Sequence, residues 1–159
     1  MFDSAGETSV RSAPADVPRT DRRAQAAAEG GEPVDGLTVA VSQPREATVV
    51  VRVLGELDLL SAPRCSRILA GAVRTVAPAA RPADDGAPQA RVVCDVDGVD
   101  FVAASGLGML VSAADDAAAV GVDLVVVASS RPVLRPLAVT GLDRHLTVVA
   151  RLDDAVDRA

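Results

Sequence analysis

The chain has 159 residues, of which 49% are apolar and only 1% aromatic, so we expect one compact domain with a core of Val, Leu and Ala. All 16 basic residues are Arg against 22 acidic residues, a formal charge of -6, which excludes chemistry that needs a Lys and disfavours direct binding of nucleic acid. No apolar run approaches the roughly 18 residues that a spanning helix needs, so we expect a cytoplasmic protein without membrane insertion.

The N-terminal segment differs in composition from the rest of the chain. Residues 1–36 are rich in Ala, Pro, Gly, Ser, Arg and Glu and show no sustained apolar period. Such a segment buries too little apolar surface to offset the entropy of ordering it. We therefore predict a disordered N-terminal tail over residues 1–36 and a folded domain over residues 37–159.

The folded part opens with a predicted β-hairpin. Apolar and polar residues alternate over residues 37–42, and a β-branched run follows at 49–54. Ser61 then gives a helix-start signal, with its hydroxyl expected to accept a free backbone amide of the first turn. Apolar residues recur at helical spacing over residues 65–76, which predicts a helix of about four turns before a flexible loop at 79–90.

Beyond this loop, strand patterns and helix patterns alternate. Alternation after an opening hairpin is typical of an α/β fold in which helices pack on one mixed β-sheet. The expected strands are 91–96, 123–128 and 146–150, and the expected helices are 107–120, a short or kinked helix at 133–139, and a terminal helix at 152–159. Cys65 and Cys94 lie inside apolar periodic segments, so we expect reduced core residues.

Two segments at predicted strand ends can carry a function. Glu56 and Asp58 follow the second hairpin strand, and Ser105 is expected to be the N-cap of a helix that contains Gly106 and Gly108. The carboxyl ends of parallel strands gather binding loops, so the two carboxylates should face the Ser105 turn. A helix N-terminus favours an anion or a phosphorylated hydroxyl. The alternative is that Ser105 only caps its helix and the glycines allow tight packing.

Catalytic interpretations find little support in the sequence. Ser105, the single His145 and an Asp could form a hydrolase triad, but Ser105 does not lie in a G-x-S-x-G elbow. Two Cys and one His lack the spacing of zinc ligands, and the glycines lack the third member of a dinucleotide fingerprint. We therefore expect a protein that is not an enzyme and uses no cofactor and no metal.

Three motifs occur in a suggestive order. They read Gly55-Glu56-Leu57-Asp58, Val99-Asp100-Phe101-Val102-Ala103-Ala104-Ser105-Gly106-Leu107-Gly108 and Val139-Thr140-Gly141-Leu142. Together they resemble the STAS domain of bacterial anti-sigma factor antagonists, over about residues 37–159. The resemblance implies a STAS-like mixed sheet with helices and a binding function without catalysis.

The resemblance also implies a partner. Family members bind an anti-sigma factor of the histidine-kinase-like ATPase fold and so free its sigma factor. This anti-sigma factor is also a serine kinase. When it phosphorylates a serine at a helix N-terminus of the antagonist, the complex breaks. No feature fixes the oligomeric state, and a monomer is expected. The partner-binding residues that the resemblance implies are Glu56, Asp58, Ala103, Ala104, Ser105, Gly106, Leu107 and Gly108.

The chain departs from the family at the phosphorylation site. Family members commonly read Asp-Ser-Ser-Gly or Asp-Ser-Thr-Gly, and the serine directly after the aspartate accepts the phosphate. Here those two positions are Ala103 and Ala104, and only Ser105 keeps a hydroxyl. The domain could bind its partner constitutively, could use Ser105 as a shifted acceptor, or could be a divergent scaffold. We favour constitutive binding.

A different class of function is an accessory or scaffold subunit of a transport or other signalling complex. Such a subunit would present an exposed apolar helix face in place of acidic loop residues. Glu56 and Asp58 argue mildly against this alternative.

Overall fold

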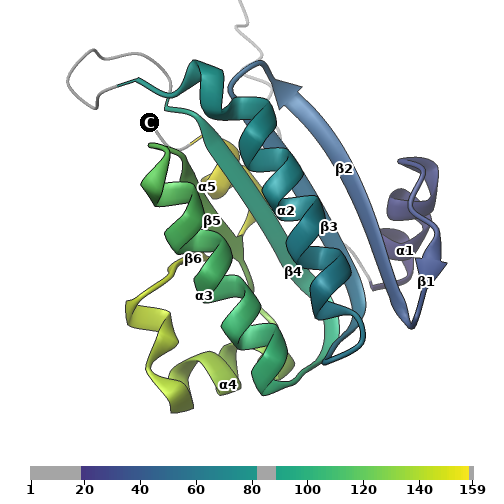
Figure 1. The fold of residues 1–159 in the computed structure, drawn as a ribbon. Coiled ribbons are helices and arrows are strands. Elements are labelled where there is room, and N and C mark those ends of the chain that lie inside the picture. The colour runs from purple at the N-terminus through teal and green to yellow at the C-terminus, as the bar shows by residue number, and fades with distance from the viewer. Residues whose placement is uncertain (1–18, 82–88, 158–159) are drawn as a thin grey trace, which may run out of the picture.

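The computed structural model of the chain describes residues 19–81 and 89–157, and Figure 1 shows a single sheet with helices packed against it. The six strands follow one another across the sheet in chain order. Strands β1, β2 and β3 pair antiparallel, whereas β3, β4, β5 and β6 pair parallel, which confirms the expected α/β fold with a mixed sheet. The strands are β1 (Pro33–Val34), β2 (Leu37–Arg45), β3 (Thr48–Leu57), β4 (Arg91–Val102), β5 (Asp123–Val127) and β6 (Thr147–Val149); the helices are α1 (Arg19–Ala28), α2 (Ala62–Val76), α3 (Ala104–Ala119), α4 (Arg131–Thr140) and α5 (Leu152–Val156), with 3-10 turns at Ala77–Ala79 and Leu142–Arg144.

The two faces of the sheet are covered by different helices. Side chains of α2, α3 and α4 share the main core with one face of the sheet. Helix α5 packs through Ala155 against the opposite face, on valines such as Val93 and Val125. Because β3, β4 and β5 are buried on both faces, their sequences read as nearly continuous apolar runs.

The N-terminal segment differs from the predicted tail, because residues 19–36 form α1, a turn and β1. Ala26 is fully buried and packs against Ala40 and Leu54 on the face that α5 also covers. Apolar periodicity could not reveal this helix, since Ala26 is its one buried apolar side chain among the residues described. The other contacts that attach the helix to the sheet are between charged side chains. The other part of the predicted tail, residues 1–18, lies outside the described residues.

Most other predicted elements occur close to where the sequence places them, but β4 continues to Val102, whereas the predicted strand ends at residue 96. The hairpin of β2 and β3 is confirmed, and α2 spans 15 residues, or about four turns. Helix α4 is short, as expected with Pro136 inside it. Most of the predicted loop, residues 82–88, lies outside the described residues, as do residues 158–159 of the predicted terminal helix. None of the helices within residues 19–81 and 89–157 is long and apolar enough to cross a membrane.

Both cysteines are free and fully buried in the main core, as the sequence predicts. Burial raises the pKa of the Cys65 thiol to about 12 and holds the pKa of the Cys94 thiol well above its usual value. The reactive thiolate is therefore nearly absent near neutral pH. We expect neither thiol to react with a chromogenic disulfide reagent at pH 8 in the native protein and both to react in denaturant. Prompt reaction of the native protein would contradict this burial.

Candidate functional site

The first two sequence motifs meet where β3 and β4 end. Leu57 and Val102 lie opposite each other in the parallel ladder. The Ala103 amide then donates a hydrogen bond to the Leu57 carbonyl at 2.9 Å. This bond joins the loop that holds Glu56 and Asp58 to the turn that begins α3, so the structure brings the two loops together as the sequence predicts.

The loop between β3 and α2 is closed by Asp58 and Ser61. One carboxylate oxygen of Asp58 accepts hydrogen bonds from the Leu60 and Ser61 amides at 2.9 and 3.0 Å. The Ser61 hydroxyl accepts from the Asp58 amide at 2.9 Å and donates to the Glu56 carbonyl at 2.8 Å. The bond from the Ser61 amide contributes most to a lowered pKa of Asp58.

These bonds change two sequence-based expectations. Ser61 does not cap α2 through its side chain, because its hydroxyl closes the preceding loop instead. The Asp58 carboxylate is engaged in the same loop, whereas the Glu56 side chain is exposed. The Asp58 carboxylate therefore holds the loop in shape, and the Glu56 carboxylate presents a negative charge to solvent.

The start of α3 is shifted relative to the prediction. Ala103 is the N-cap residue, because its carbonyl accepts the first helical bond from the Leu107 amide at 3.1 Å. Ser105 therefore lies within the first turn and is not the N-cap. Its hydroxyl oxygen is buried and has no hydrogen-bond partner. Ala104, one residue earlier, is exposed at the first helical position.

Gly106 and Gly108 have different surroundings. A Cβ atom at Gly106 would lie 2.7 Å from the Leu57 carbonyl oxygen and 2.8 Å from the Leu57 Cγ. A Cβ atom at Gly108 would meet no atom within 4 Å. Leu107, between them, is buried in the main core. The tight packing that the sequence allows for both glycines therefore holds at Gly106 only, where α3 touches the end of β3.

Sequence reasoning missed three exposed apolar side chains at this end of the sheet. Leu59 and Leu60 are 76% and 75% exposed in the loop after β3, and Phe101 is 53% exposed beside Glu56 in the ladder. The available signal was that the two leucines fall between a strand pattern and a helix pattern and belong to neither. We call Glu56, Leu59, Leu60, Phe101 and Ala104 the strand-end surface.

The structure does not assemble the hydrolase triad that the sequence left open. The His145 Nε2 lies 3.1 Å from an Asp115 carboxylate oxygen, and both side chains are exposed. The Ser105 hydroxyl has neither of them as a partner. In the third motif, Gly141 has a φ of +74° and ends α4, which assigns that glycine a role as a helix stop.

A comparison with known protein families decides the family of this chain. The STAS domain family model matches residues 39–155. The chain belongs to the STAS domain family. Helix α1 lies N-terminal to the matched part of this STAS domain. No curated protein matches the chain.

Solved structures agree with this assignment. An anti-sigma factor antagonist from Mycobacterium paratuberculosis is 26% identical, with a TM-score of 0.61 over 79% of this STAS domain chain and 95% of that one. The phosphorylated form of the Bacillus cell fate determinant SpoIIAA is 20% identical, with a TM-score of 0.53 over 76% and 97% of the two chains. The murine anion transporter Slc26a9 shares the fold at 18% identity, with a TM-score of 0.54 over 72% of this chain and 18% of that one.

Proposed function

We propose that this STAS domain is an anti-sigma factor antagonist that binds a kinase-like anti-sigma factor through the strand-end surface and frees the sigma factor. The similarity to the mycobacterial antagonist supports the general role. Binding is constitutive in this proposal, because the position that accepts phosphate in the family is Ala104. The protein then acts by its abundance and not by its phosphorylation state.

The observation that carries the proposal is the difference between two neighbouring residues. Ala104 is exposed where a kinase could reach it, but its side chain has no hydroxyl. The Ser105 hydroxyl oxygen is buried, so the first turn of α3 would have to open before a kinase could use it. In this proposal, the strand-end surface docks on the partner but offers the kinase no accessible phosphoacceptor.

The chemistry of the strand-end surface indicates what a partner must offer. Leu59, Leu60 and Phe101 expose apolar area, and Glu56 adds a negative charge beside Phe101. Apolar anchors with a charged rim are typical of specific protein interfaces. A suitable partner presents an apolar depression flanked by Arg or Lys side chains.

A pull-down with the tagged full chain from native lysate, read by mass spectrometry, tests the proposal. We expect it to recover an ATPase of the histidine-kinase-like fold, with Ser105 unmodified on the bait. The matched control is the full chain with Leu59 and Leu60 both replaced by Ser, which should lose that partner and remain folded because both side chains are exposed. Recovery of transporter components in place of such an ATPase would overturn the proposal and favour an accessory subunit.

A further inference from the structure

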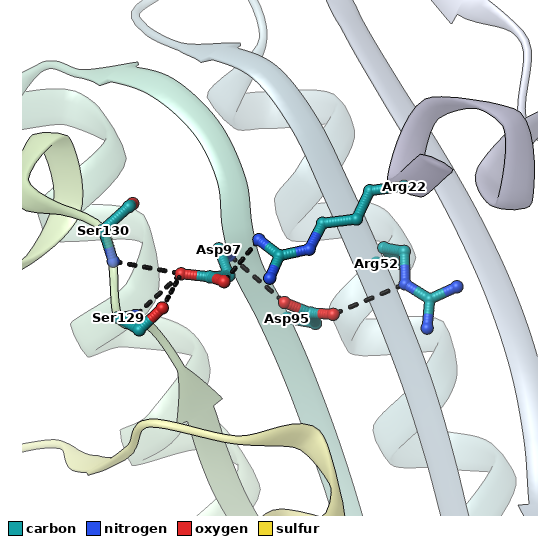
Figure 2. Close-up of polar contacts among 6 residues, drawn as sticks. All are labelled: Arg22, Arg52, Asp95, Asp97, Ser129 and Ser130. Carbon is teal, nitrogen blue, oxygen red and sulfur yellow. Dashed lines mark hydrogen bonds and ion pairs between the residues drawn. The ribbon is translucent and has the colours of Figure 1, made fainter. Parts of the chain in front are cut away.

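Helix α1 is held on the sheet mainly by charged contacts at its two ends. Arg22 forms an ion pair with Asp97 of β4, as Figure 2 shows. At the other end, Arg52 of β3 donates to both carboxylate oxygens of Glu29, at 3.0 and 2.9 Å. Ala26 is the buried apolar side chain between these two contacts.

Asp97 links α1 to a third loop at the carboxyl edge of the sheet. One of its carboxylate oxygens accepts from the Ser129 amide and the Ser129 hydroxyl, both at 2.7 Å, and from the Ser130 amide at 3.0 Å. The other oxygen pairs with Arg22. Ser130 is the N-cap residue of α4, so the same carboxylate holds both α1 and the connection between β5 and α4 (Figure 2).

A second carboxylate, that of Asp95, links the two sheet residues that hold α1, Asp97 and Arg52. One Asp95 oxygen accepts from the Asp97 amide at 3.1 Å, and the other pairs with the Arg52 Nε at 3.4 Å. The contacts of α1 and of the β5–α4 connection therefore belong to one connected network (Figure 2).

The Asp97 charge depends on its partners because the side chain is only 6% exposed. Burial alone would raise the pKa of Asp97, but hydrogen bonds from Ser129 and the Arg22 cation hold it below its usual value. Without Arg22, the carboxylate loses the cation that favours its charged form. Its charged form, which accepts the bonds from Ser129 and Ser130, becomes less stable.

We infer that α1 is a latch, whose docking through Arg22 and Asp97 orders the β5–α4 connection. Asp97 is then a positioning residue that acts on this connection. The connection lies at the same carboxyl edge as the strand-end surface, because β3, β4 and β5 run parallel. Only the consequence for partner binding rests on the proposed function: α1 would supply a regulatory input that needs no phosphoacceptor.

Hydrogen exchange read by mass spectrometry on the full chain, without any partner, tests the latch. In Arg22→Gln, we expect exchange of the α1 amides and of the Ser129 and Ser130 amides to rise together by about fivefold. Glu29→Gln should give the same paired rise, because it releases the opposite end of α1. Arg67→Gln, at an exposed position of α2, is the matched loss of positive charge and should change neither segment.

Two results would overturn the latch. In one, α1 exchanges faster in both variants while Ser129 and Ser130 keep wild-type exchange. Docking of α1 would then not order the β5–α4 connection. In the other, α1 keeps its protection in both variants, so that the ion pairs do not hold it. Neither result bears on whether the strand-end surface binds an anti-sigma factor, since no partner is present.

Discussion

Ala104→Glu is expected to weaken binding of the kinase-like anti-sigma factor by about a hundredfold. The new carboxylate stands exposed at the first position of α3, on the strand-end surface that already carries Glu56. Binding must desolvate the new charge, and we expect the turn that carries Ala104 to face the apolar depression of the partner and not its flanking cations. A titration of the full chain against the recovered partner measures the change.

The control for this variant separates charge from size and stability. Ala104→Gln adds nearly the same volume without the charge and should weaken binding by less than about tenfold. A Glu side chain in the first turn of a helix interacts favourably with the helix dipole, so the thermal midpoint of Ala104→Glu should not fall. Equal affinities for Ala104→Glu and the wild type would show that this turn lies outside the interface.

Gly106→Ala is expected to lower the free energy of unfolding by about 3 kcal/mol. The added Cβ would lie 2.7 Å from the Leu57 carbonyl oxygen, which already accepts the Ala103 amide. A backbone carbonyl cannot rotate away as a flexible side chain can, so α3 must shift off the end of β3. Urea unfolding of the full chain measures the loss.

Gly108→Ala is the matched control in the same helix. Its Cβ would meet no atom within 4 Å, and replacing an exposed helical glycine with Ala stabilises a helix by about 1 kcal/mol. The two variants should therefore move the urea midpoint in opposite directions. Equal stability of both variants would mean that α3 does not pack against Leu57 as described.

The fold was predictable where apolar periodicity is strong. The valine runs of β3, β4 and β5 come from burial on both faces of the sheet, and the apolar stripe of α2 comes from burial in the main core. The sequence shows both patterns directly. Helix α1 was missed because it has no apolar stripe that the sequence could show. Its attachment depends on Arg22 and Glu29 finding charges on β4 and β3, and those pairs are far apart in sequence.

The candidate site was predictable in position but not in detail. The order of the motifs places Glu56 and Ala104 at neighbouring strand ends, because parallel strands bring their carboxyl ends together. The first residue of α3 could not be predicted from the sequence. The helix begins with a bond to the backbone carbonyl of Ala103, and every residue has such a carbonyl, so no side chain marks the position. The position of Ser105 in the first turn of α3, with its hydroxyl buried, follows from that shift.

The loss of the phosphoacceptor is the central claim, and restoring the acceptor tests it most directly. The complex of the full chain with its ATPase partner is incubated with Mg²⁺ and ATP, and intact-mass spectrometry and gel filtration follow phosphate and assembly. We predict that the wild-type complex persists without phosphate, whereas Ala104→Ser gains one phosphate and dissociates. Phosphate on Ser105 of the wild-type chain, with dissociation of its complex, would contradict constitutive binding.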